Sequence, residues 1–221
     1  MDDKELFKAH PSTAEEECFD IFDEKMEHIG IAPRREAHRR GLWHKVIQCW
    51  LFKREKDKTY IILQKRSPLK DNYPSLFDTS AAGHIRAGEE IEEGVREIYE
   101  EIGISVDYSE LTFLEIVKQK KEKKDLMDYQ FAYLYIYECN KPLLHYTLQK
   151  EEVEALVEIE LTRFKELIEG NVLEVEGHGI TLDEGGNNKA AAYTIAFESL
   201  VPHGRAYFKK VYEGIVNYLQ E

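Results

Sequence analysis

Three glutamates near the middle of the chain have the spacing of a metal site. They are Glu97, Glu100 and Glu101, and residues three and four apart in an α-helix share one face. Like charges at this spacing destabilise a helix unless something neutralises them. Mg²⁺ prefers oxygen ligands and usually shares them with a substrate phosphate. The spacing therefore predicts a site for Mg²⁺ or Mn²⁺; the alternative is a solvated acidic face, because 43 of the 221 residues are acidic.

The residues around these glutamates predict a short helix with one buried side. Ile98 and Ile102 are four apart on a different face and can pack into a core. Gly83 and Gly88 precede the helix, where glycine allows close backbone approach. Gly103 follows the last glutamate, at the position where a helix commonly ends.

Residues 83–104 resemble the Nudix box, Gly-x5-Glu-x7-Arg-Glu-U-x-Glu-Glu-x-Gly-U, in which U is a large aliphatic residue. Gly83 is followed by five residues and then Glu89, and the stretch from Arg96 to Ile104 matches every specified position of the second half. The resemblance implies a hydrolase of diphosphate-linked small molecules. The metal ligands that it implies are Glu97, Glu100, Glu101 and the Gly83 carbonyl.

The box departs from the family pattern at one point. Six residues separate Glu89 from Arg96, where the family has seven. In the family a contact between these two positions braces the loop, so the deletion puts that contact in doubt. Glu90 could take the place of Glu89. The spacing of the three helix carboxylates is unaffected.

Over residues 18–165 the chain also resembles the Nudix branch related to isopentenyl diphosphate isomerase. The resemblance rests on residues 23–52, on Q-K-R-S at 64–67 and on P-S-L-F-D at 74–78. The isomerase uses a cysteine directly before the Gly-His that opens its box, and Ala82 stands there in this chain. Alanine cannot transfer a proton, so hydrolysis is favoured over isomerisation.

The isomerase also binds a metal through histidines. This chain keeps His84, and it has His38 and His44 near the corresponding N-terminal stretch. Two interpretations stay open for these histidines. They either ligate a metal, or they are surface or supporting residues that help to bind phosphate.

The expected reaction is attack by water on a phosphorus of the pyrophosphate. Metal ions lower the pKa of a bound water and neutralise charge on the bridging oxygen, and a carboxylate accepts the proton. In relatives an acidic residue opens the aromatic strand that is expected here at 128–137, which selects Asp128. The candidate catalytic residues are Glu97, Glu100 and Asp128. The candidate substrate contacts are Lys65, Arg66, His44 and His84, and the residues expected to support the box are Glu89 and Arg96.

Two other functions stay open from the sequence. One is an isomerase like the enzyme of the related branch. The other is a ligand-binding Nudix domain without catalysis, in which the shortened box no longer works.

Composition narrows the class of protein. The net charge of −13 argues against a general nucleic-acid binder, and there is no apolar run near 18 residues that would cross a membrane. The first residues lack the apolar core of a signal peptide. Three widely spaced cysteines give neither a disulfide framework nor zinc spacing. We expect a cytoplasmic enzyme whose partner is a small-molecule diphosphate, and a homodimer is left open.

The expected fold is α/β, a Nudix-type α/β/α sandwich with a mixed β-sheet. The expected division is a polar arm at 1–17, a catalytic domain at 18–170 and an extension at 171–221 packed on it. Strands are predicted at 18–22, 46–52, 59–64, 128–137 and 151–160, and helices at 161–169 and 207–219. Residues 53–58 are predicted to form a charged hairpin loop, and the basic run 118–124 a hairpin tip. The glycine-rich stretch 174–190 is predicted to be an insertion or lid loop.

Overall fold

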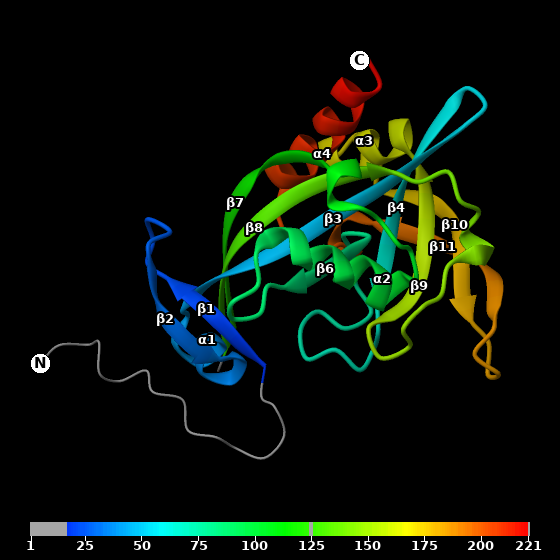
Figure 1. Cartoon of the computed structure of the whole chain (residues 1–221). Helices are drawn as coiled ribbons and strands as arrows, with labels where there is room; N and C mark the ends of the chain where they lie inside the picture. Colours follow the sequence, from blue (N-terminus) through cyan, green and yellow to red (C-terminus); the bar gives the residue numbers. More distant parts are fainter. Residues whose placement is uncertain (1–16, 124–125, 221) are drawn as a thin grey trace, which may run out of the picture. The chain divides into compact units, whose positions relative to one another are not determined.

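The computed structural model describes residues 17–123 and 126–220, which form two compact units (Figure 1). The first unit contains residues up to Ile47, then Gly83–Val95 and Glu115–Leu134. The second contains Gln48–Ala82, Arg96–Leu114 and the chain from Tyr135 onward. The arm predicted at 1–17 lies outside the described residues except for its last position.

The first unit is built on three antiparallel strands and a short helix. β1 (Cys18–Phe22) is the predicted first strand and pairs with β2 (His28–Pro33) and with the start of β3 (Trp43–Glu55). Helix α1 (Arg34–Arg40) contacts both β1 and β2. It ends at Gly41, whose φ of 65° is the left-handed conformation that glycine tolerates.

The second unit contains an antiparallel sheet. Its strand order is β11 (Asn188–Ala196), β10 (Glu174–Leu182), β9 (Val153–Glu160) and β4 (Lys58–Arg66), which pairs in turn with the end of β3. β5 (Phe77–Asp78) also pairs with β4. The strands β3, β7 (Thr112–Lys123) and β8 (Leu126–Glu138) contribute residues to both units, as the bounds show.

Helices cover both faces of this sheet. Trp50 on β3 packs against Phe164 of α3 (Leu161–Glu169) and edge-on against Phe208 of α4 (Arg205–Tyr218), with ring centroids 6.4 and 6.0 Å apart. Neighbouring strand residues point to opposite faces, so Leu51 and its partner Ile62 face the other way. Gln64 shares the face of Ile62, and its side chain bonds Glu101 of α2 (Arg96–Ile102). Helices α3 and α4 therefore cover one face and α2 the other (Figure 1).

The remaining elements are short. β6 (Ala81–His84) and the 3₁₀ helix η2 (Ile91–Val95) belong to the box. Three further 3₁₀ turns are η3 (Tyr108–Glu110), η4 (Leu143–His145) and η5 (Phe197–Ser199).

Residues 174–190 are not a lid loop, and that prediction is wrong. They form β10, the tight turn after it and the start of β11. The glycines that suggested a loop are needed by the sheet. A Cβ at Gly179 would lie 1.9 Å from the Leu156 carbonyl oxygen, and a Cβ at Gly177 would lie 2.4 Å from a Val157 methyl. Glycine within a strand marks such close approach of neighbouring backbone.

Two predicted loops are also shorter than expected. The hairpin between β3 and β4 has only residues 56 and 57 outside the strands, because β3 continues to Glu55 and β4 begins at Lys58. The basic run at 118–124 lies mainly within β7, which reaches Lys123. There the lysines contact acceptors: Lys118 bonds the Glu24 carbonyl, and Lys120 Nζ lies 2.8 Å from the Glu24 carboxylate.

Candidate active site

Helix α2 buries the side that carries its isoleucines, as predicted. Ile98 and Ile102 have no exposed surface. The helix ends at Gly103, whose φ is 69° and whose amide donates to the Tyr99 carbonyl. A Cβ at Gly103 would lie 2.7 Å from Thr147 Cβ, so both the backbone conformation and the close packing require glycine there.

The carboxylate of Glu101 is buried next to a second carboxylate. Glu101 is 5% exposed, and its Oε2 accepts hydrogen bonds from Gln64 Nε2 at 3.0 Å and from the Ala82 amide at 3.1 Å. Burial, followed by the charge of Glu97, raises the pKa of Glu101 to about 8. A buried carboxylate beside another acid is stable as an anion only when a cation is close. The side chains therefore fit a divalent cation.

Arg96 orients the other two helix carboxylates. Its Nη1 contacts the Glu97 carboxylate and lies 3.4 Å from Glu100 Oε2. The side chain of Glu97 is 14% exposed and that of Glu100 is 44% exposed. The supporting role of Arg96 stays a prediction, and these two contacts are consistent with it. The contact between Glu89 and Arg96 stays a prediction; the Glu89 carboxylate accepts a hydrogen bond from the Arg86 amide at 2.9 Å.

A second candidate metal site lies in the first unit. His38, His44, His84 and Asp128 each offer one ligand atom, and these atoms lie within 4.8 Å of one another. Phe19, which is fully buried, stacks on the rings of His44 and His84 at 4.8 and 4.6 Å. Burial is the main reason that the pKa of His38 falls to about 4, so this histidine is neutral and can act as a ligand.

Neighbouring groups orient two of these ligands. His44 Nδ1 lies 2.9 Å from the Leu42 carbonyl and donates to it, which leaves the lone pair on Nε2. Nε2 lies 3.4 Å from Asp128 Oδ1, and Asp128 Oδ2 accepts from Gln130 Nε2 at 2.9 Å. Nitrogen ligands with one carboxylate suit Zn²⁺ or another transition metal. Of the two interpretations of the histidines, the geometry favours metal ligation.

The predicted substrate contacts fall into two groups. His44 and His84 belong to the histidine cluster. Lys65 Nζ lies 2.6 Å from the Glu154 carboxylate, and Arg66 Nη1 donates to Asp78 at 3.2 Å. Both cations thus have acidic partners within the chain, and a role in phosphate binding stays a prediction.

Sequence reasoning missed the two glutamines that orient acids, Gln64 and Gln130. The contact of Gln130 with Asp128 could have been predicted, because the two residues are two positions apart and so share one face of a strand. The contact of Gln64 could not, because its partner Glu101 is 37 residues away in sequence.

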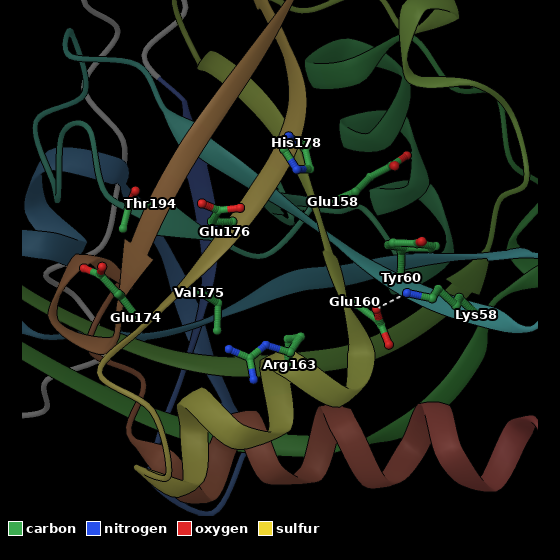
Figure 2. A pocket seen from close by; sticks show the side chains of 10 residues that line it. All are labelled: Lys58, Tyr60, Glu158, Glu160, Arg163, Glu174, Val175, Glu176, His178 and Thr194. Atoms are coloured by element: carbon green, nitrogen blue, oxygen red, sulfur yellow. Dashed lines mark hydrogen bonds and ion pairs between the residues drawn. The ribbon is translucent and has the colours of Figure 1, made fainter.

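A hollow of about 510 Å³ lies over β4, β9 and β10 (Figure 2). Four of the side chains around it are glutamates, and Glu160 is paired with Lys58 at 2.7 Å. Glu158, another of the four, is paired with Lys53 at 2.6 Å. None of the predicted site residues lines this hollow.

Comparison with known proteins decides the family. The NUDIX domain family matches residues 21–177. The chain belongs to the Nudix family. An uncharacterized Nudix hydrolase of Clostridium acetobutylicum is 39% identical over 203 residues, which cover 92% of this chain and 98% of that protein. Nudix hydrolase 3 of Arabidopsis thaliana is 34% identical over 147 residues, 64% of this chain and 19% of that protein.

The isomerase branch is also represented among the relatives. Isopentenyl-diphosphate Delta-isomerase 2 of Photorhabdus laumondii is 23% identical over 187 residues, which cover 84% of this chain and 91% of that protein. The predicted membership, a Nudix hydrolase with weaker similarity to these isomerases, is confirmed.

Solved structures confirm the predicted fold class. A MutT/nudix family protein from Enterococcus faecalis aligns with a TM-score of 0.52 at 13% identity, over 78% of this chain and 62% of that one. A Nudix hydrolase from M. smegmatis aligns with a TM-score of 0.50 at 14% identity, over 89% and 94%. None of the helices in the described part of the chain has the length and apolar character that crossing a membrane needs.

Proposed function

We propose that this Nudix hydrolase cleaves a diphosphate-linked small molecule with the help of Mg²⁺ or Mn²⁺ held by α2. The observation that carries the proposal is the buried Glu101 carboxylate, whose pKa is raised by burial and by Glu97. With Glu100 on the same face, these are oxygen donors of the kind that hard cations take. The Gly83 carbonyl completes the proposed ligand set.

The bound metal would supply charge neutralisation at the pyrophosphate and a water of lowered pKa. The residues of the chain prepare the site. Gln64 and the Ala82 amide fix the Glu101 carboxylate through its Oε2 and leave Oε1 for a ligand. Arg96 holds Glu97 and Glu100 in one orientation. Glu100 has the most exposed side chain of the three box glutamates and is proposed, with Asp128 as the alternative, to accept the proton of the water.

A substrate panel tests this function. Nucleoside diphosphates, dinucleotide polyphosphates and nucleotide sugars are incubated with the full chain and Mg²⁺, and release of phosphate-bearing products is followed. Turnover of at least one class is expected. Glu100→Gln and Glu101→Gln should each reduce it strongly, and Glu92→Gln, which changes an exposed acid just before α2, serves as the matched control. Turnover that survives both box substitutions contradicts the site assignment, and no turnover in any class favours a ligand-binding domain.

The histidine cluster is the one observation that favours a second candidate, an isomerase. The related branch binds a metal through histidines, and three are gathered here with Asp128. Against it, Ala82 replaces the catalytic cysteine, and its amide is used to bond Glu101. Incubation with isopentenyl diphosphate separates the two functions, since formation of the allylic isomer supports the isomerase. We propose that the cluster binds a transition metal in either case.

We further propose a cytoplasmic location, assembly with a second copy into a homodimer, and a catalytic domain at 18–170 with an extension at 171–221.

A further inference from the structure

The loop between β4 and β5, residues 67–76, lies beside the box helix. The Ser67 amide of this loop donates to the Glu152 carbonyl at 2.9 Å, and Lys70 forms an ion pair with Glu152. The turn that contains Glu152 is bonded in turn to the helix, because the Gln149 amide donates to the Glu101 carbonyl at 2.9 Å. The loop also forms part of an apolar pocket of about 270 Å³, to which it contributes Pro68 and Leu69.

The backbone of this loop is held in an unfavourable conformation. Tyr73 and Ser75 have φ values of 52° and 62°, in the left-handed region that side chains other than those of glycine rarely adopt. Each such residue costs free energy and persists only where its surroundings hold it. The contacts of the loop must therefore restrain these two residues.

Arg66 supplies the restraint at the base of the loop. Its Nε donates to the Asn72 carbonyl at 3.0 Å across the loop. Its own amide donates to the Leu76 carbonyl at 2.9 Å, and its carbonyl accepts from the Ser75 amide at 3.1 Å. Arg66 thus holds the loop at three points, each of them at or next to one of the two left-handed residues.

Arg66 is in turn held by a group from the C-terminal part of the chain. Its Nη1 donates to Asp78 Oδ2 at 3.2 Å, and His203 Nε2 lies 2.7 Å from Asp78 Oδ1 and donates to it. The His203 side chain is fully buried and stacks on the ring of Tyr207 at 4.4 Å. A buried ion pair keeps its geometry only when its remaining hydrogen-bonding sites are filled, and His203 fills one on Asp78.

We propose that His203 is a positioning residue for the loop at 67–76, acting through Asp78 and Arg66, and that this loop contacts the substrate. This inference rests on the proposed function, because it makes residues 67–76 one wall of the site that binds the group attached to the diphosphate. It also gives Arg66 a role other than direct phosphate contact. Loss of the brace should change substrate affinity, while the box carboxylates that support turnover keep their contacts.

The test compares three variants of the full chain. His203→Leu removes the donor to Asp78 with similar volume. His203→Gln restores a donor at the place of Nε2. Tyr207→Phe keeps the ring that stacks on His203 but removes the hydroxyl that accepts from Trp50 and donates to Gln48, and so controls for stability lost in the adjoining helix α4.

Two measurements are made on each variant. Amide hydrogen exchange of residues 67–76 is followed without any ligand, and KM and kcat are measured with Mg²⁺ and the panel compound that wild type turns over fastest. His203→Leu should speed loop exchange about 10-fold and raise KM about 10-fold with kcat within about 2-fold. His203→Gln should resemble wild type in both. Tyr207→Phe should lower the melting temperature with loop exchange and KM unchanged.

Each outcome decides the inference. Unchanged loop exchange in His203→Leu overturns it, as does an equal increase in Tyr207→Phe. If His203→Leu does not fold, Arg66→Lys takes its place, since it keeps the charge beside Asp78 but loses the Nε donor to Asn72, and the same loop exchange is expected. If wild type turns over no compound of the panel, the proposed function fails while the exchange comparison still tests the brace.

Discussion

The box helix and the histidine cluster each surround a buried carboxylate, but they set its pKa in opposite directions. Burial and Glu97 raise the pKa of Glu101 to about 8. Burial is the largest single effect on Asp128 and would raise its pKa, but His44 and, to a smaller extent, Lys121 and His38 together lower it. In both sites a glutamine amide donates to the acid, at 3.0 Å from Gln64 and at 2.9 Å from Gln130.

The opposite pKa shifts of Glu101 and Asp128 indicate which kind of cation each site would bind. An acid surrounded by acids gains most from a hard divalent ion that arrives with its own positive charge. The pKa of an acid among imidazoles is lowered by them, so that acid is already compensated in part, and the nitrogen atoms favour a transition metal. We therefore expect the neighbours of each carboxylate to decide which metal its site binds.

The largest expected effect is on turnover, which should depend more on the box glutamates than on the histidine cluster. Glu101→Gln and Glu97→Gln should reduce Mg²⁺-dependent turnover by about 100-fold or more, because each removes a proposed ligand. Single substitution of a cluster residue, His38→Ala, is expected to reduce it less. Initial rates at saturating Mg²⁺ measure both. An equal loss in the two classes would remove the functional distinction between the sites.

The next effect concerns the kind of metal. His44→Ala should weaken Zn²⁺ binding about 100-fold, since a ligand is lost from a site of four. Calorimetric titration of the metal-free chain with Zn²⁺ and then with Mg²⁺ measures this. The Mg²⁺ isotherm should be unchanged by His44→Ala and abolished by Glu101→Gln. Zinc that binds the variant as tightly as wild type would exclude the cluster as its site.

Without metal, the Glu101→Gln substitution should stabilise the protein, although it removes a proposed metal ligand. In chelator, Glu101→Gln should stabilise the fold by about 3 kcal/mol at pH 7, because the raised pKa means that the wild-type carboxyl must take up a proton on folding. The amide of the variant is neutral in both states, and its oxygen can still accept from Gln64 and Ala82. The folded pKa of Glu101, about 8, is above its ordinary value of 4.5. Wild type is thus most stable, as far as this group is concerned, below pH 4.5 and loses that stability as pH rises through 8.

Denaturant unfolding at several pH values checks this expectation. The two proteins should approach each other near pH 5 and differ most above pH 8. A destabilised Glu101→Gln variant in chelator would show that the carboxylate is compensated without a metal.

The smallest effects come from the two glutamines. Gln64→Met and Gln130→Met should each weaken metal binding at their own site about 10-fold, since groups that orient a ligand contribute less than the ligand. Each serves as the control for the other. Binding constants for Mg²⁺ and Zn²⁺ in both variants give the result, and an effect that crosses between the metals would contradict separate sites.

The predictable parts of the chain are those whose structure depends on the spacing of residues that are close in sequence. The helix at 96–102 followed from glutamate and isoleucine spacing, and the helix at 161–169 agrees with α3 in both bounds. The glycines at 177 and 179 were misread, because glycine has the same local signal in a loop and in a strand that another backbone approaches closely.

The site was predictable only in part for a related reason. Asp128 and the histidines were each noticed, but their gathering around Phe19 depends on strands that bring distant positions together. The brace through His203 and Asp78 joins residues 125 positions apart, and no local pattern signals such a contact.

The bond from the Ala82 amide to Glu101 has a consequence for how this chemistry changes over time. Because the main chain makes the contact, the side chain at 82 takes no part in holding the acid. A cysteine substituted there would leave this main-chain hydrogen bond in place. Gain or loss of a proton-transferring side chain at position 82 is therefore separable from the anchoring of the box acid.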